Sequence, residues 1–129
     1  MKERIKILSI STKKMKLEEA KNWQNLIEKF APDMYDTIEA VGEEETIKQV
    51  VKYRPEIILL NDKVKDALNL LKKIKQMHPL SAVFILINMV DEEQEMIDEY
   101  TASGAYKCYL SPLMIESLIH DMYVALNLE

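Results

Sequence analysis

Two short apolar segments are each followed by side chains that could do chemistry. The amide and carboxylate of Asn61 and Asp62 come directly after the apolar run 57–60, and the segment 11–14 (STKK) comes after the apolar run 5–10. A carboxylate such as Asp62 can act as a nucleophile toward a phosphoryl group, and hydroxyls with lysines at a helix start can hold an anion. Because residues 11–14 include no glycine, we favour a solvated, helix-capping loop over a phosphate cradle.

Histidine and cysteine are too sparse to form a metal site or a disulfide. The chain has two histidines, His78 and His120, and a single cysteine, Cys108. Isolated histidines do not make a metal site, and one cysteine cannot pair within the chain. We expect surface positions for both histidines, a buried strand position for Cys108, and neither a metal nor a cofactor.

The elements that must position these side chains alternate between apolar strands and segments of helical period. Strands are predicted at 5–10, 35–41, 57–60, 82–87 and 106–110. Helices are predicted at about 17–30, after Gly42, at 67–77, from Asp91 to about Ser103, and from Pro112 onward. Parallel strands joined by crossover helices give this alternation. The sequence therefore predicts one doubly wound α/β domain with five strands and five helices, and the run 57–60 as its central strand.

Composition favours a single globular domain. Of 129 residues, 48% are hydrophobic and 30% charged, and no linker or repeat interrupts them. Apolar runs such as 82–87 are too short to span a membrane, and no signal peptide precedes the first strand. The net charge of -5 gives no positive field toward nucleic acid or anionic lipid. We expect a cytoplasmic domain over 1–129, which could be the amino-terminal part of a longer protein, with no direct nucleic-acid or membrane partner.

Three local phrases, together with the order of elements, resemble the receiver domain of two-component response regulators. Residues 5–8 (IKIL) resemble its first strand, and 54–60 (RPEIILL) its phrase leading into the phosphoacceptor strand. Residues 104–105 and 109–112 (GA, then YLSP) resemble the phrase that ends in its Lys-Pro pair. The resemblance implies a flavodoxin-like (βα)5 fold with a parallel sheet of order 2-1-3-4-5, and function at the carboxyl ends of the strands.

The resemblance also implies a site whose functional residues have been replaced. The family's acidic pair falls on Ser11 and Thr12, and its phosphoacceptor falls on Asn61. Its hydroxyl residue falls on Ile87 or, one residue later, on Asn88, and its lysine and proline fall on Ser111 and Pro112. Only the proline matches, and the family's aromatic position on the fifth strand falls on Cys108. Phosphoryl transfer to such a domain needs a carboxylate nucleophile and Mg²⁺ held by anionic oxygens. Neutral side chains at these positions predict a degenerate phosphoacceptor pocket without metal.

We therefore predict a pseudo-receiver that acts in signal transduction without phosphorylation and is not an enzyme. It would bind a protein partner or a second copy through the face that helix 91–103, strand 106–110 and the last helix form. Aromatic and sulfur side chains on this face are the candidate contacts: Tyr100, Tyr106, Cys108 and Tyr123.

Two alternatives stay open. One is a receiver that uses a relocated phosphoacceptor, either Asp62 or a hydroxyl of Ser11 or Thr12. Strand alternation points Asp62 away from the side that Asn61 faces, so we favour a solvent-facing or helix-capping Asp62. The other alternative is a sensor of a small anion or nucleotide at the altered pocket.

Overall fold

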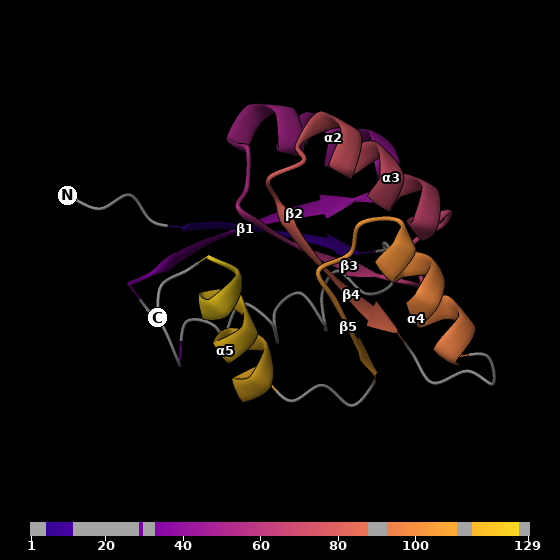
Figure 1. The fold of residues 1–129 in the computed structure, drawn as a ribbon. Coiled ribbons are helices and arrows are strands. Elements are labelled where there is room, and N and C mark those ends of the chain that lie inside the picture. Colours follow the sequence, from indigo (N-terminus) through magenta and orange to yellow (C-terminus); the bar gives the residue numbers. More distant parts are fainter. Residues whose placement is uncertain (1–4, 12–28, 30–32, 88–92, 111–114, 127–129) are drawn as a thin grey trace.

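Five parallel strands form one sheet in the computed structural model, which describes residues 5–11, 29, 33–87, 93–110 and 115–126 (Figure 1). The strands are β1 (Ile5–Ser11), β2 (Tyr35–Val41), β3 (Ile57–Asn61), β4 (Ala82–Ile87) and β5 (Lys107–Leu110). Their order in the sheet is β2-β1-β3-β4-β5, and every neighbouring pair is parallel. The predicted order and the central place of β3 are confirmed.

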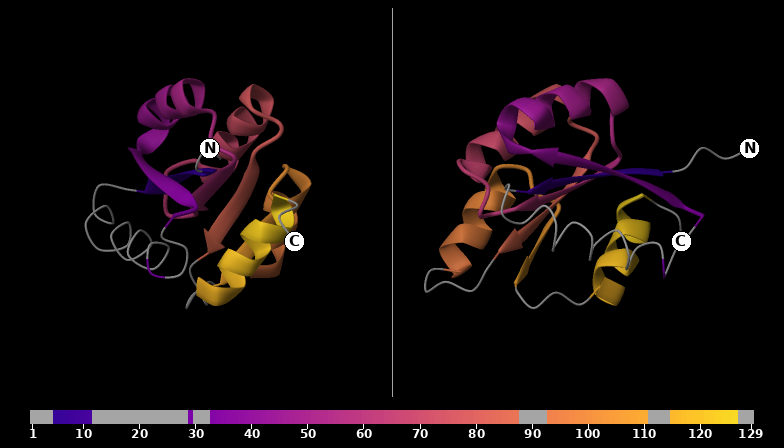
Figure 2. Two further views of the ribbon diagram at one scale, coloured as in Figure 1. Left: turned by 90° about the vertical axis from the view of Figure 1, so that its left-hand side faces the viewer. Right: turned by 180° about the vertical axis from the view of Figure 1, so that it is seen from behind.

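Four helices alternate with these strands in the described part of the chain. They are α2 (Gly42–Tyr53), α3 (Ala67–Met77), α4 (Glu93–Ala102) and α5 (Ile115–Ala125). The helix predicted at about 17–30 lies outside the described residues, except that residue 29 has a helical backbone. The predicted alternation is therefore confirmed for four of the five helices. Figure 2 shows α2, α3 and α4 on one side of the sheet and α5 on the other.

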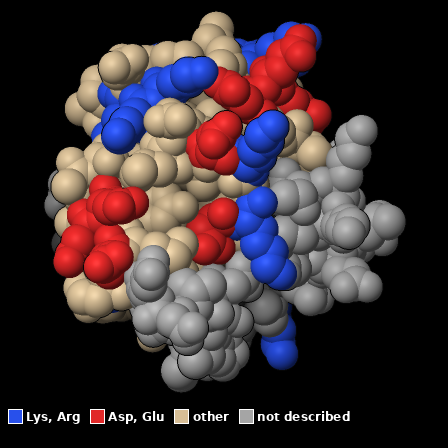
Figure 3. All heavy atoms as spheres, turned by 90° about the vertical axis from the view of Figure 1, so that its right-hand side faces the viewer, with Lys and Arg blue, Asp and Glu red and all other residues tan. Residues whose placement is uncertain are grey.

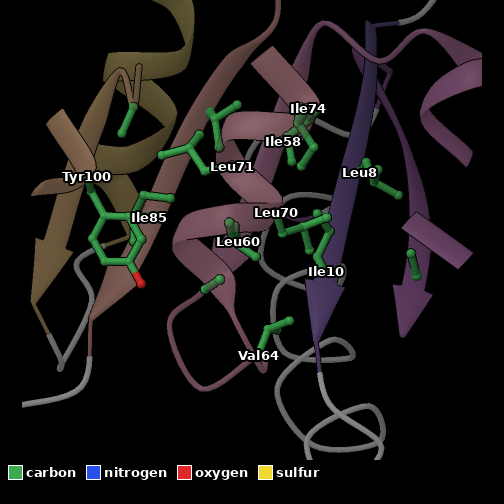
Figure 4. Close-up of a cluster of buried hydrophobic side chains, with 14 of the residues drawn as sticks. Leu8, Ile10, Ile58, Leu60, Val64, Leu70, Leu71, Ile74, Ile85 and Tyr100 are labelled. Atoms are coloured by element: carbon green, nitrogen blue, oxygen red, sulfur yellow. The ribbon is translucent and has the colours of Figure 1, made fainter. Parts of the chain in front are cut away.

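Both faces of the sheet are buried because apolar residues occupy consecutive strand positions. On β3, Ile58 and Leu60 pack toward α2, α3 and α4, whereas Ile57 and Leu59 pack toward α5. Side chains on a strand alternate between faces, so one apolar run supplies two cores. Figure 4 shows the first of these cores. Each fully buried Leu or Ile contributes about 1.5–3 kcal/mol, which makes the run 57–60 a main source of stability.

Glycine closes α4 and fixes where β5 begins. Gly104 has φ +110°, and hydrogen bonds run from Ala105 N–H to Tyr100 O (3.0 Å) and from Gly104 N–H to Thr101 O (3.2 Å). This pair of bonds is a Schellman motif, which satisfies the last carbonyls of the helix. The next amide, that of Tyr106, donates to Val83 O at 2.8 Å. The strand β5 then begins at Lys107, one residue later than predicted.

No helix in the described part of the chain is long and apolar enough to cross a membrane.

Candidate functional site

Asn61 ends β3 at the carboxyl edge of the sheet and organises the loop that follows. Its side chain is 6% exposed, and its Oδ1 accepts a hydrogen bond from the Lys63 N–H at 2.9 Å. Its backbone carbonyl accepts from Val64 N–H at 3.0 Å. An Asn that bonds to the backbone two residues later forms an Asx turn, which fixes a short loop. Val64 is 5% exposed and belongs to the core, so its side chain anchors the loop to the core.

The donor set at this edge does not suit the Mg²⁺ ion that receiver domains use for phosphorylation. Asn61 offers a neutral amide whose oxygen already accepts the Lys63 N–H, and β1 ends at Ser11 rather than at a carboxylate. Mg²⁺ binds through anionic oxygens because its dehydration must be offset. Among the described residues, no group of three or more His, Cys, Asp or Glu side chains could hold a metal ion.

The other predicted pocket positions are described only in part. Ser11 is the last residue of β1 and pairs with Val41 of β2. Ile87 ends β4, is 1% exposed, and contributes an apolar side chain to the core rather than a hydrogen-bonding group. The remaining predicted positions lie outside the described residues: Thr12, Asn88, Ser111 and Pro112.

Asp62 is half-buried in the loop that follows β3. Burial first, and then the charges of Asp62, Cys108 and Glu99, raise the pKa of Tyr100 to about 12. The Asp62 N–H donates to Leu86 O at 2.9 Å, which holds the residue beside β4. The N-cap position of α3 is Asp66, so the alternative that Asp62 caps the helix was wrong, and its side chain is exposed only in part.

Cys108 takes the middle of β5 and is half-buried against the core on the α4 side. Burial raises the pKa of the Cys108 thiol to about 11, although a hydrogen bond with the Thr101 side chain lowers it. The residue is therefore a neutral thiol near pH 7. A buried strand position was predicted, and the side chain is buried only in part.

No protein-family model matches this chain, and no curated protein matches it. Solved structures do match. One is the signal receiver domain of a DNA-binding response regulator from Colwellia psychrerythraea 34H, with TM-score 0.81, 17% identity and coverage of 95% of this chain and 98% of that chain. Another is a two-component response regulator from Clostridium difficile, with TM-score 0.77, 22% identity and coverage of 96% and 97%. The chain has the receiver fold.

A third similar structure shows what a working member of this fold can carry. A response regulator from Burkholderia pseudomallei, solved with a phosphorylated aspartic acid, a calcium ion and citrate, matches with TM-score 0.74 and 16% identity over 89% of this chain and 64% of that chain. That protein thus carries an aspartyl phosphate on a similar fold. Whether it forms depends on side chains, because fold alone does not carry activity.

The predicted interaction face of the receiver fold has one buried and three accessible candidate contacts. Tyr106 is 46% exposed and packs edge-on against Phe84, with ring centroids 5.2 Å apart. Tyr123 is half-buried and donates to Met34 Sδ at 3.0 Å, and Cys108 is also half-buried. Tyr100 is 6% exposed and lies in the core, so its selection as a surface contact was wrong. It follows Met96 and Ile97 on the inward side of α4.

A polar cluster that we did not predict from the sequence joins β5 to α5. Tyr109 and Lys107 donate to the same oxygen, Asp121 Oδ2, at 2.5 and 2.8 Å. Burial would raise the pKa of Asp121, but these hydrogen bonds and the charge of Lys107 outweigh it and lower the pKa. Burial and the bond to Asp121 raise the pKa of Tyr109 well above its usual range. Lys107 and Tyr109 are two positions apart on β5, so their side chains lie on the same face of the strand. This spacing is the signal from which the pair could have been predicted.

Acidic and basic side chains are mixed on one side of the molecule. Figure 3 views the molecule from the side toward which β1 and β2 point, and lysines and arginines there lie beside aspartates and glutamates on the described surface. That part of the face therefore has no uniform positive field. A uniform positive field would favour the binding of a large anionic ligand.

Proposed function

We propose that this chain is a signalling module with a receiver fold that works through protein contacts and not through phosphorylation at the usual acceptor position. The observation that carries the proposal is Asn61, whose neutral amide ends β3 and bonds to the Lys63 N–H. An amide is not a nucleophile toward an acyl phosphate. The proposal includes a cytoplasmic location, no enzymatic activity and no direct contact with nucleic acid or membrane.

The proposed contact surface consists of α4, β5 and α5, and its occupant is a protein partner or a second copy of the chain. Exposed apolar area supports this surface, since Tyr106 is 46% and Val124 is 40% exposed. The bonds from Tyr109 and Lys107 to Asp121 hold β5 and α5 in fixed relative positions. A surface fixed before binding loses less entropy when it binds.

Intact-mass spectrometry after treatment with acetyl phosphate and Mg²⁺ tests the first part of the proposal. We expect no phosphoryl mass on the wild-type chain or on the Asn61→Asp variant, because Ser11 supplies no charge for the ion. Phosphoryl mass on the wild-type chain would contradict the proposal. If Asp62→Asn then removed that mass, the relocated acceptor at Asp62 would be the correct reading.

Sedimentation equilibrium with a matched pair of variants tests the second part for a second copy. Val124 on α5 and Val51 on α2 are 40% and 62% exposed, and both lie in the last turns of their helices. We expect Val124→Asp to raise the dissociation constant of the dimer by about tenfold, because it places a charge in an apolar contact. Val51→Asp should leave the constant unchanged. Equal effects of both variants would contradict the proposed face.

A further inference from the structure

Leu80 protrudes from the connection between α3 and β4. It is 91% exposed, the largest exposed fraction among the large hydrophobic side chains of the described residues. One exposed leucine is common on a protein surface, so its meaning depends on what surrounds it. Leu80 is surrounded by a fixed backbone, a second apolar side chain and a group of cations.

Hydrogen bonds on both sides of Leu80 hold its loop in place. Lys75 Nζ donates to Pro79 O at 2.8 Å and to Ser81 O at 2.6 Å. Ser81 Oγ donates to His78 O at 2.8 Å, and the His78 side chain is itself buried. Both neighbours of Leu80 are therefore fixed. A loop that is ordered before binding loses less entropy when it binds.

Arg54 joins the end of α2 to the end of α3. Its Nη1 donates to Met77 O at 3.0 Å, and its backbone has φ 48°, which is unfavourable for a residue other than glycine. Both helices return from the carboxyl end of the parallel sheet to its amino end. The left view of Figure 2 faces this amino end and shows α2 and α3 side by side. Val51 lies in the last turn of α2 and is 62% exposed, so it adds a second apolar side chain here.

Charge is segregated on the same two helices. Beyond the first turn of α2, residues 46–55 and 67–81 contain six cations and no carboxylate, although the net charge of the chain is -5. The cations are Lys48, Lys52, Arg54, Lys72, Lys73 and Lys75. Lys48 and Lys73 form ion pairs with glutamates in the first turn of α2. The other four form no ion pair with a described carboxylate. The first carboxylate after residue 55, that of Glu56, accepts the Lys6 N–H at 3.1 Å.

We propose that this end of the molecule, the Leu80 surface, binds an acidic segment of a protein partner. The Leu80 surface consists of two apolar side chains and four cations: Leu80, Val51, Lys52, Arg54, Lys72 and Lys75. Apolar side chains of the segment would contact Leu80 and Val51, and its carboxylates would pair with the cations. A nucleic acid would supply negative charge but little apolar area, and the net charge of -5 opposes approach to an anionic membrane.

The Leu80 surface is separate from the candidate pocket and from the proposed contact surface. The pocket lies at the carboxyl end of the sheet, and the contact surface consists of α4, β5 and α5. The inference therefore adds a second binding surface and does not depend on the proposed function.

An NMR titration of the full chain with a designed peptide tests the inference. The probe is a helical peptide with leucine at every third or fourth position and glutamate at the others, an arrangement that gives one apolar and one acidic face. We expect saturable shifts of the amides of residues 51–54 and 77–81, and an affinity that falls as salt is added. A matched peptide with lysine in place of glutamate should shift none of them.

Two pairs of variants separate the apolar contribution from the charge contribution. We expect Leu80→Ser to weaken binding of the acidic peptide about tenfold and Leu80→Met to retain it, because methionine keeps the apolar contact. Lys52→Gln combined with Lys72→Gln should weaken binding about fivefold at low salt, whereas Lys65→Gln, exposed in the loop before α3, should not. All of these positions are exposed, so the fold is retained.

Four results would overturn the inference. They are the absence of saturable shifts, an equal response to the lysine peptide, an unchanged affinity in Leu80→Ser, and shifts confined to α4, β5 and α5. Binding to vesicles that contain phosphatidylglycerol, lost in Leu80→Ser and without any response to the peptide, would also overturn it and would identify a membrane site. Phosphoryl mass on the wild-type chain, in contrast, would overturn the proposed function and leave the Leu80 surface standing.

Discussion

Asn61 uses its side chain inside its own loop, and this use predicts a measurable cost of removal. Its Oδ1 accepts the Lys63 N–H at 2.9 Å, and the residue is 6% exposed. We expect Asn61→Ala to lower the free energy of unfolding by about 1 kcal/mol, the usual value of one such bond. Urea denaturation would measure it. The control is Asn69→Ala at an exposed position of α3, which should be neutral or slightly stabilising. Equal losses of stability in both variants would mean that the Asn61 side-chain bond contributes nothing to the free energy of unfolding.

His78 is buried at the end of α3, although a surface position was predicted. It is 8% exposed, and its Nε2–H donates to the carbonyl of Pro55 at 2.8 Å. We expect His78→Ala to cost about 2 kcal/mol, because a buried carbonyl then loses its donor. The exposed His120 provides the comparison, and His120→Ala should change stability by less than about 0.5 kcal/mol. Thermal unfolding that ranks the two variants in the opposite order would refute this role.

Sequence reasoning identified Asn61 but misplaced Tyr100 and His78, for physical reasons. Asn61 follows an apolar run directly, so its position at the strand end is local information. Tyr100 carries a polar group, yet the spacing of Met96, Ile97 and Tyr100 is that of one helix face and indicated burial. His78 is buried through its bond to Pro55, 23 residues earlier, which no local pattern reveals.

The helix α4 ends at a glycine with positive φ, Gly104, and the helix α2 begins at another, Gly42. Substitution by alanine would strain the backbone at both positions, but would cause a steric conflict only at Gly104. A Cβ on Gly104 would lie 3.0 Å from Lys75 Cγ, whereas one on Gly42 would meet nothing within 4 Å. Lys75 cannot move aside freely, because its Nζ donates to Pro79 O and Ser81 O at 2.8 and 2.6 Å. We expect Gly104→Ala to cost about 2 kcal/mol and Gly42→Ala about 1 kcal/mol in urea denaturation. A larger cost at Gly42 would contradict this account.

The cluster that joins β5 to α5 predicts a stability loss in acid. Because hydrogen bonds from Lys107 and Tyr109 lower the pKa of Asp121 in the folded chain, its contribution is present above the unfolded pKa of about 3.9. It is lost as the pH falls through the lower folded value. Asp121→Asn should therefore cost about 1–2 kcal/mol at neutral pH and show a shallower loss below pH about 4.

Urea denaturation across the acid range would check the Asp121 prediction. Asp33→Asn, at an exposed position before β2, should change stability by less than about 0.5 kcal/mol at neutral pH. If Asp121→Asn behaved like this control at neutral pH, the hydrogen bonds from Lys107 and Tyr109 would contribute nothing to the junction between β5 and α5.

The ends of several strands could be predicted from the glycine, proline and polar residues that interrupt the apolar segments. The predicted bounds of β2 and β4 agree with the structure, since Gly42 follows one and Pro79 and Ser81 precede the other. β3 extends one residue beyond the apolar run because Asn61 still pairs with Leu86. The predicted caps Asp91 and Ser111 lie outside the described residues.

At the scale of the whole molecule, the receiver fold is found at low sequence identity. Identities of 17% and 22% accompany TM-scores of 0.81 and 0.77. The alternation of apolar strands with amphipathic helices predicts the class from sequence alone, because both faces of a parallel sheet must be covered. The strand order came from the family resemblance, since many orders satisfy the same alternation.

Two buried phenols and one partly buried phenol, distributed over both faces of the sheet, predict how the whole molecule unfolds in alkali. The pKa values of Tyr35 and Tyr100 are raised to about 12, chiefly by burial, and that of Tyr109 is raised as well. A raised folded pKa favours the neutral phenol, so this stability is complete below the unfolded pKa of about 10 and is lost as pH rises from about 10 toward 12. Each phenol should contribute about 1.4 kcal/mol per pH unit to that slope. Urea denaturation over this range should give a slope smaller by one proton for Tyr100→Phe and by two protons for Tyr100→Phe with Tyr109→Phe. An unchanged slope in the double variant would mean that these phenols ionise as readily in the folded chain as in the unfolded one.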